Sequence, residues 1–157
     1  MLITLDIETN TSHDVIWCAV TQNIDTGEML EHYDSESLAQ VLCSATGIVG
    51  HNIIGFDAPV LEKQWSLQIP TEKLKDTLVL SRLWNPSLEG GHSLDSWGKR
   101  IGYHKIDFHD YDGGLSDEMV EYCRQDVALT TRLYKHLTAK LKSEEFSEQC
   151  VDLEEKV

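Results

Sequence analysis

The order of the β-type and helical segments is the feature that most restricts the fold of this chain. Residues 2–8 alternate apolar and polar side chains, residues 14–23 form a second β-rich segment, and residues 23–33 read as a turn followed by a third strand. Helical and strand patterns then alternate as far as a long helix over 116–141. This order predicts an α/β domain with a mixed central sheet of about five strands flanked by helices.

Local start and stop signals divide the rest of the chain. Asp25-Thr26-Gly27 predicts a hairpin turn, and Ser116 is expected to cap the long helix. The remaining expected elements are a short helix from Asp34, a buried strand over 47–52, a helix over about 57–65, a strand or strand-to-helix segment over 73–84, a short helix over 93–102 closed by Gly102, and a polar loop over 104–114.

Bulk properties indicate the class of protein. A length of 157 residues suggests one domain with a sizeable core. No apolar run approaches the roughly 18–20 residues that cross a bilayer, and an aspartate at position 6 argues against a signal peptide. The four cysteines (Cys18, Cys43, Cys123 and Cys150) form no C-x-x-C pair. We therefore expect reduced thiols and a cytoplasmic protein.

The net charge of −14 restricts the partners. Acidic residues cluster at 25–36, at 107–121 and from Glu144 onward, and a solvated surface explains most of them. A chain without a basic face is a poor binder of long duplex DNA. Bound cations would neutralise carboxylates at a site, however, so such a protein can still hold a short single-stranded end.

Two acidic residues lie within the first β-type segment. Asp6 and Glu8 are two positions apart on a strand, so both side chains emerge on one face, about 7 Å apart. Two carboxylates on one face repel each other and resist ionisation unless a cation lies between them. The alternative is that the strand ends here and Glu8 is simply exposed to solvent.

Three further residues are candidates for the same site. Tyr122 and Asp126 are four positions apart on the long helix, and hence on one face, where a buried Tyr–Asp hydrogen bond is the simpler explanation. Asp57 precedes Ala58-Pro59 and a helical pattern, so it is equally well explained as an N-cap.

Taken together, these motifs resemble a known superfamily. D-x-E in LDIET, N-x-x-x-F-D in HNIIGFD and Y-x-x-x-D in YCRQD are similar to the motifs of the DEDD 3′-5′ exonucleases. The histidine branch of that superfamily would have histidine at position 121, where this chain has Glu121, whereas Tyr122 fits the tyrosine branch. The segments KDTLVLSRLWNP and GGHSLDSWGKRIG further resemble the proofreading domain of podophage family A DNA polymerases.

The resemblance implies a ribonuclease H-like fold and hydrolysis of phosphodiester bonds with two divalent cations, Mg²⁺ or Mn²⁺. Asp6, Glu8 and Asp126 would hold the first cation, Asp6 would bridge to the second, and Asp57 would act mainly through bound water. Tyr122 and Glu8 would orient the attacking water. The expected substrate is the 3′ end of single-stranded DNA, and the expected role is proofreading in DNA replication.

Other residues are weaker candidates. Thr9, Asn52, Phe56 and His92 are possible substrate contacts, although Phe56 also suits the core and His92 a structural turn. Asp95 is expected at a helix start. Core packing is expected for the four tryptophans, Trp17, Trp65, Trp84 and Trp97.

The resemblance also suggests a division of the chain. Residues 1–142 would form the exonuclease domain, and residues 143–157 an acidic tail similar to the start of the linker to a polymerase domain. A separately encoded polymerase domain is one possible partner. The alternative function is an acidic, non-catalytic protein that binds a polymerase or mimics DNA, with its carboxylates serving only as charge.

Overall fold

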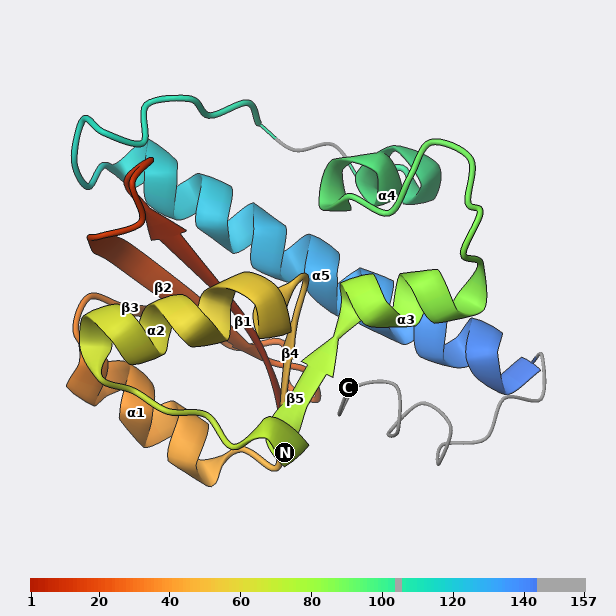
Figure 1. Ribbon diagram of the computed structural model, residues 1–157, viewed down its shortest axis with the longest axis horizontal. Coiled ribbons are helices and arrows are strands. Elements are labelled where there is room, and N and C mark those ends of the chain that lie inside the picture. The colour runs from red at the N-terminus through yellow and green to blue at the C-terminus, as the bar shows by residue number, and fades with distance from the viewer. Residues whose placement is uncertain (104–105, 144–157) are drawn as a thin grey trace.

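Five strands form one mixed sheet in the computed structural model, which describes residues 1–103 and 106–143 (Figure 1). The strand order is β3-β2-β1-β4-β5. The strands are β1 (Leu2–Thr9), β2 (Ile16–Asn23), β3 (Met29–His32), β4 (Gly47–Gly50) and β5 (Leu74–Asp76). The first three pair antiparallel, whereas β4 is parallel to both β1 and β5. The predicted mixed five-stranded sheet is confirmed.

The helices follow the predicted order, and the structure fixes two boundaries that the sequence left inaccurate or open. They are α1 (Ser35–Ser44), the π-helical turn η1 (Ile53–Asp57), α2 (Ala58–Trp65), the 3₁₀ turn η2 (Thr71–Lys73), α3 (Thr77–Trp84), α4 (Leu94–Ile101) and α5 (Asp117–Ser143). The strand expected over 47–52 ends at Gly50, and η1 begins three residues later. The ambiguous segment 73–84 divides into β5 and α3, because the Asp76 side chain accepts the N–H of Leu78 and starts a helix.

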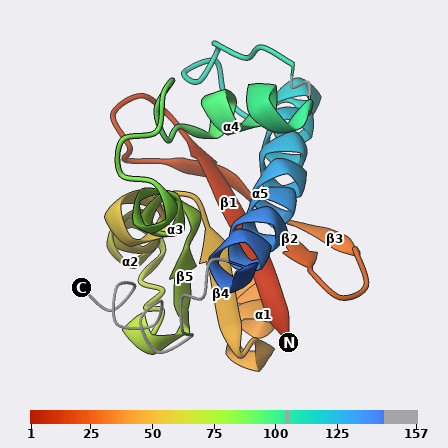
Figure 2. The same cartoon turned by 90° about the vertical axis from the view of Figure 1, so that its right-hand side faces the viewer.

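Alternation along β1 assigns each side chain to one face of the sheet. Ile3, Leu5 and Ile7 are buried in the core that also contains residues of α1 and α2. The intervening side chains face α5, as the 2.7 Å hydrogen bond between the hydroxyls of Thr4 and Thr131 shows. Figure 2 shows α5 running along one side of β1 with α2 on the other. This period of two therefore directs Asp6 and Glu8 towards α5.

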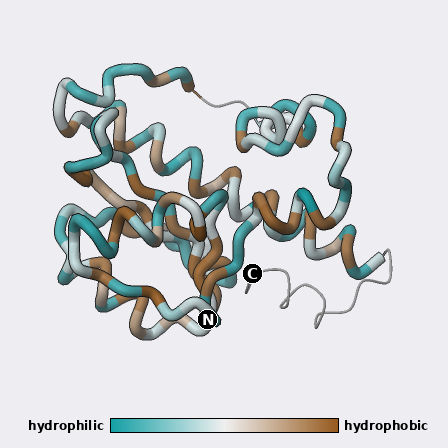
Figure 3. The backbone as a smooth tube through the Cα atoms, viewed as in Figure 1, coloured by the Kyte–Doolittle hydropathy of each residue, from teal (hydrophilic) through white to brown (hydrophobic). Residues whose placement is uncertain are grey.

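A second apolar cluster joins α3 and α4 to the C-terminal half of α5. Its centre is Trp97, which is 2% exposed and whose indole N–H donates to the Ser81 hydroxyl at 2.8 Å. Figure 3 shows the hydrophobic stretches gathered on the strands and on the helices beside them. Trp97 is thus core, as expected, and the half-buried Trp65 and Trp84 also pack against the apolar clusters. Trp17 is half-buried and belongs to neither cluster.

The remaining predictions concern the ends of elements and the tail. Ser116 caps α5, since its hydroxyl accepts the N–H of Met119 at 3.1 Å, and Gly102 ends α4 in the left-handed region. Residues 106–115 form no helix or strand, as predicted for that loop. Apart from Ser143, the predicted tail lies outside the described residues. None of the described helices has the length and apolarity needed to cross a membrane.

Candidate active site

Asp6 and Glu8 lie close together on β1, facing α5. One carboxylate oxygen from each lies within 4.8 Å of the other and of the Cys123 sulfur. Glu8 is only 7% exposed, so the alternative of a solvent-exposed strand end is wrong. Burial, followed by the charges of Asp6 and Asp126, raises the pKa of Glu8 to about 11. A buried group of like charges of this kind needs a proton or a cation.

A β-bulge follows this pair. The register between β1 and β2 shifts between Glu8 and Thr9, so that Glu8 pairs with Cys18 and Thr9 with Ile16. Such a bulge increases the local twist and changes the direction of the side chains at the end of a strand. The extra residue, Trp17, belongs to β2, so Glu8 lies beside an irregular stretch of that strand.

The first turns of α5 supply the second part of the site. Asp126 is 8% exposed and close enough to Glu8 to raise its pKa. Burial raises the pKa of Tyr122, and the charge of Asp126 and a hydrogen bond to Tyr111 raise it further. Tyr122 therefore keeps its hydroxyl proton at neutral pH. The i, i+4 spacing directs both side chains towards the carboxylates of β1, as predicted.

Asp57 reaches the site from η1, on the other side of β1. Its backbone is helical and its side chain makes no capping bond, so the interpretation as an N-cap is wrong. Instead the carboxylate accepts a hydrogen bond from the backbone of Ile7. Its Oδ2 is buried and has no hydrogen-bond partner among the described residues. Burial, and then the charge of Asp6, raises the pKa of Asp57 well above its usual range.

The position of η1 depends on Asp76 at the end of β5. One Asp76 oxygen accepts the N–H of Asn52 at 2.8 Å, and the other accepts the N–H of Ile54 at 3.1 Å. Asn52 has a left-handed backbone with φ of 60°. A buried carboxylate thus satisfies the backbone donors of a turn that would otherwise lack partners. Asp76 holds the segment that carries Asp57, a role that the sequence did not reveal.

Two of the four weaker substrate candidates border the site. Thr9 and Phe56 line a hollow of about 310 Å³ that also contains Glu8 and Tyr111. The Phe56 ring packs edge-on against His13, with 4.9 Å between ring centroids, and it also contacts the core.

The other two candidates do not line that hollow. Asn52 is exposed and lies at the turn before η1. His92 Nδ1 is 2.6 Å from the Ser81 hydroxyl, as expected for a structural turn. Asp95 lies in the first turn of α4, whose N-cap is Ser93, so it is a helix-start residue as predicted.

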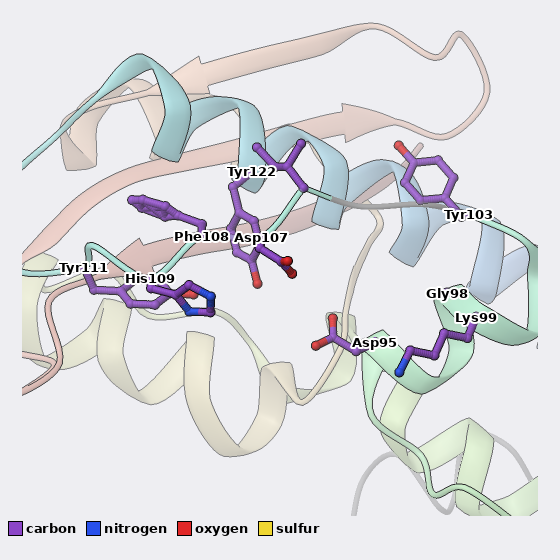
Figure 4. Close-up of a pocket in the computed structure, with 10 residues that line it drawn as sticks. Asp95, Gly98, Lys99, Tyr103, Asp107, Phe108, His109, Tyr111 and Tyr122 are labelled. Carbon is purple, nitrogen blue, oxygen red and sulfur yellow. The ribbon is translucent and has the colours of Figure 1, made fainter.

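A second hollow, of about 420 Å³, adjoins Tyr122. Figure 4 shows Asp95 and Lys99 of α4 across it from Tyr122 and Phe108. Phe108, Tyr111 and Tyr122 form an aromatic cluster with ring centroids 5.2 to 6.5 Å apart. Sequence reasoning missed Phe108 and Tyr111. Their only signal was two aromatic residues, three positions apart, in an otherwise polar loop.

The donor set fits a divalent cation. Carboxylates from β1, η1 and α5 influence one another's pKa, and they are the ligand type that hard divalent ions prefer. A cation would also give the buried Oδ2 of Asp57 a partner and relieve the repulsion around Glu8. Asp6, Glu8, Asp57 and Asp126 are therefore the residues that could hold metal.

Comparison with known proteins finds relatives among the phage DNA polymerases. The chain is 28% identical to the DNA-directed DNA polymerase of Escherichia phage T7 over 185 aligned residues, which covers 87% of this chain and 26% of the polymerase. It is 32% identical to the polymerase of Enterobacteria phage T3 over 130 residues, covering 57% of this chain and 18% of that protein. The chain thus spans about a quarter or less of these relatives.

Solved structures show the same fold. Brucella melitensis NrnC with bound Mg²⁺ superposes with a TM-score of 0.75 at 20% identity, covering 98% of this chain and 81% of that one. The family B DNA polymerase of Pyrobaculum calidifontis gives 0.77 at 15% identity, covering 99% of this chain and 27% of that one. The fold is ribonuclease H-like, as in the DEDD exonucleases. Since residues 4–142 match the 3′-5′ exonuclease family, the chain belongs to that family.

Proposed function

We propose that this protein removes nucleotides one at a time from the 3′ end of single-stranded DNA by hydrolysis that requires two divalent cations, Mg²⁺ or Mn²⁺. The observation that carries the proposal is a set of neighbouring carboxylates from three separate elements: Asp126 acts on the buried Glu8, and Asp6 acts on both Glu8 and Asp57. One Asp57 oxygen has no hydrogen-bond partner among the described residues. The family match supports it independently.

Each side chain has a role in the proposed reaction. Asp6, Glu8 and Asp126 would hold one cation, and Asp6 and Asp57 the other. Bound cations would supply a more acidic water and stabilise charge on the leaving oxygen. Tyr122, protonated at neutral pH, would donate a hydrogen bond to the attacking water and so orient it towards the phosphorus. No side chain is needed as a covalent nucleophile.

The two hollows provide room for the end of a strand. They share Tyr111, and aromatic side chains line both. Aromatic faces stack on bases without regard to sequence, which suits an enzyme that removes every nucleotide in turn. The net charge of −14 disfavours an extended duplex interface and is compatible with a short single strand.

The cellular role is part of the same proposal. The polymerases of phages T7 and T3 are several times longer than the matched segment. We propose that this exonuclease acts in proofreading, on 3′ ends made by a polymerase domain in the same or a separate chain. The non-catalytic DNA-mimic alternative uses carboxylates only as surface charge, so it gives no reason for the burial of Glu8 and Asp57.

The test is a nuclease assay with DNA labelled at the 3′ end and, in parallel, at the 5′ end. With Mg²⁺ or Mn²⁺ we expect the 3′ label to be released first as a mononucleotide and the 5′ label to give a descending ladder. Chelation, or Asp6→Asn or Asp126→Asn, should lower the rate by on the order of 10³-fold. Glu72→Gln, at an exposed carboxyl, is the matched control. Activity that survives chelation would contradict the proposal, and an RNA substrate would test the sugar preference.

A further inference from the structure

We propose that Cys123 forms, together with Asp6 and Glu8, a binding site for thiophilic divalent cations such as Zn²⁺ and Cd²⁺. In this site a sulfur ligand is added to the carboxylates assigned to hydrolysis. The binding itself stands on the geometry of these three residues, whereas its effect on hydrolysis rests on the proposed function.

The distances suit a shared ion. One ligand atom each from Asp6, Glu8 and Cys123 lies within 4.8 Å of the other two. The Cys123 sulfur is 3.5 Å from Oδ2 of Asp6. A tetrahedral zinc ion, with bonds of about 2.3 Å to sulfur and about 2.1 Å to oxygen, holds those two atoms roughly 3.6 Å apart. The sulfur and the carboxylate oxygen therefore already have the separation of two ligands of one ion.

Asp57 provides an independent indication that a cation fits here. Its side chain is 3% exposed, and within the described part of the chain its Oδ2 has no hydrogen-bond partner. The charge of Asp6 is the largest charge effect on the pKa of Asp57, so the two carboxylates are neighbours. Buried carboxylate oxygens are rarely left without a partner, and a bound ion would supply one.

The surroundings of Cys123 explain why a thiol at this position can be a ligand. The residue lies on α5 between Tyr122 and Asp126, is fully buried, and donates through its S–H towards the backbone and side-chain oxygens of Asp6. On binding a soft cation the S–H bond would break, its proton would pass to solvent, and a metal–sulfur bond would form, with no change of oxidation state.

The same site would treat hard and soft cations differently. Mg²⁺ prefers oxygen ligands, so it would leave Cys123 protonated. Zn²⁺ and Cd²⁺ bind thiolates well and exceed Mn²⁺ in affinity for such donor sets. An ion held by Cys123, Asp6 and Glu8 would occupy two of the carboxylates needed for hydrolysis. Thiophilic cations should therefore inhibit the enzyme in competition with Mg²⁺.

The test is a titration of the metal-free protein with Cd²⁺, followed by the ultraviolet sulfur-to-cadmium charge-transfer absorbance. Wild-type protein should give a band that saturates at one equivalent, and Cys123→Ser should lose it. Cys43→Ser, at an exposed thiol of α1, should keep the band. Cys18→Ser removes the buried thiol of β2 that lies beside Cys123, and this variant should also keep the band. Asp6→Asn should retain the thiol but bind Cd²⁺ about tenfold or more weakly.

Inhibition is measured separately, relative to each variant's own rate with Mg²⁺. Cys123→Ser should require about tenfold or more Cd²⁺ for half-inhibition. An unchanged band in Cys123→Ser, or its loss in Cys18→Ser alone, would overturn the assignment. A band in a protein without nuclease activity would instead refute the proposed function and leave the metal site standing. Circular dichroism of each variant shows whether it is folded.

Discussion

Replacing Glu8 by glutamine should stabilise the metal-free protein while removing a metal ligand. Glu8 is 7% exposed and lies beside Asp6 and Asp126, and burial is the largest cause of its raised pKa of about 11. At neutral pH it therefore keeps a proton in the folded chain that it loses in the unfolded chain. Glutamine has the same shape, carries no charge, and can still donate a hydrogen bond to the Asp6 side chain.

The magnitude follows from linkage between protonation and folding. A carboxyl that is protonated when folded and ionised when unfolded lowers the free energy of unfolding by about 1.4 kcal/mol for each pH unit above its unfolded pKa. Between 4.5, the ordinary value for Glu8, and neutral pH this amounts to about 3 kcal/mol. Any folded pKa above 7 gives the same figure. Glu8→Gln should therefore gain up to about 3 kcal/mol.

The sign of the pH dependence provides a second test. The pKa of Glu8 is raised in the folded protein. Its contribution to the free energy of unfolding is therefore greatest below the unfolded pKa and is lost as pH rises towards 11. Asp57 acts in the same direction. His32, His51 and His136 have lowered pKa values, so their opposite effect is confined to pH near and below 6.5. Between about pH 7 and 8.5 the stability of the metal-free wild type should fall, and Glu8→Gln should reduce that slope.

The assay is urea unfolding of both proteins with chelator at about pH 7 and 8.5, repeated with Mg²⁺. Glu72→Gln, at an exposed carboxyl on η2, should change neither the midpoint nor the slope. Mg²⁺ should stabilise the wild type more than Glu8→Gln, because the variant lacks one anionic ligand. The reasoning would be refuted by a metal-free wild type that becomes more stable over this pH range, or by Glu8→Gln unfolding at lower urea.

Three further predictions concern neighbouring groups. Asp76→Asn should lower the free energy of unfolding by about 2–3 kcal/mol in urea melts, because an amide N–H₂ replaces one acceptor of the backbone donors of η1 and α3. Thr131→Val should cost about 1–3 kcal/mol in thermal melts by leaving the buried Thr4 hydroxyl without its partner, and the double variant with Thr4→Val should be less destabilised than the sum. Tyr122→Phe should lower turnover on single-stranded DNA about 10–100-fold while Mg²⁺ still raises the melting temperature as in wild type; an unchanged rate would remove Tyr122 from the mechanism.

The sequence predicted the parts of the site that depend on local periodicity. The period of two along β1 aligned Asp6 with Glu8, and the i, i+4 spacing aligned Tyr122 with Asp126, as the structure shows. The mixed sheet also followed from the order of the elements. These predictions need only the geometry of a single strand or helix.

Contacts between distant segments were not predictable in the same way. Cys123 is 117 positions from Asp6, and no pattern in the sequence relates a single cysteine to a strand carboxylate. Phe108 and Tyr111 belong to a polar loop, where packing against Tyr122 depends on how the loop crosses α5. The capping interpretation of Asp57 was wrong because η1 runs directly into α2, so that Asp57 is itself helical and the N–H of Ala58 donates to the carbonyl of Ile53. Asp76, which accepts N–H groups 22 and 24 positions away, holds the start of that turn.

The separation of β1 from β4 explains why a carboxylate from η1 can take part in the site at all. The pairing of these strands ends at Thr4 and Val49, so farther along β1 no strand of the described residues pairs with the edge that faces β4. Asp57 takes the place of that strand by accepting a hydrogen bond from the backbone of Ile7, between the two acidic residues of β1. One of its oxygens is thus fixed by the strand, and Oδ2 is left for a ligand. The backbone N–H of Ile7 therefore orients the Asp57 carboxylate beside Asp6. Asp57 does not cap a helix to hold this position.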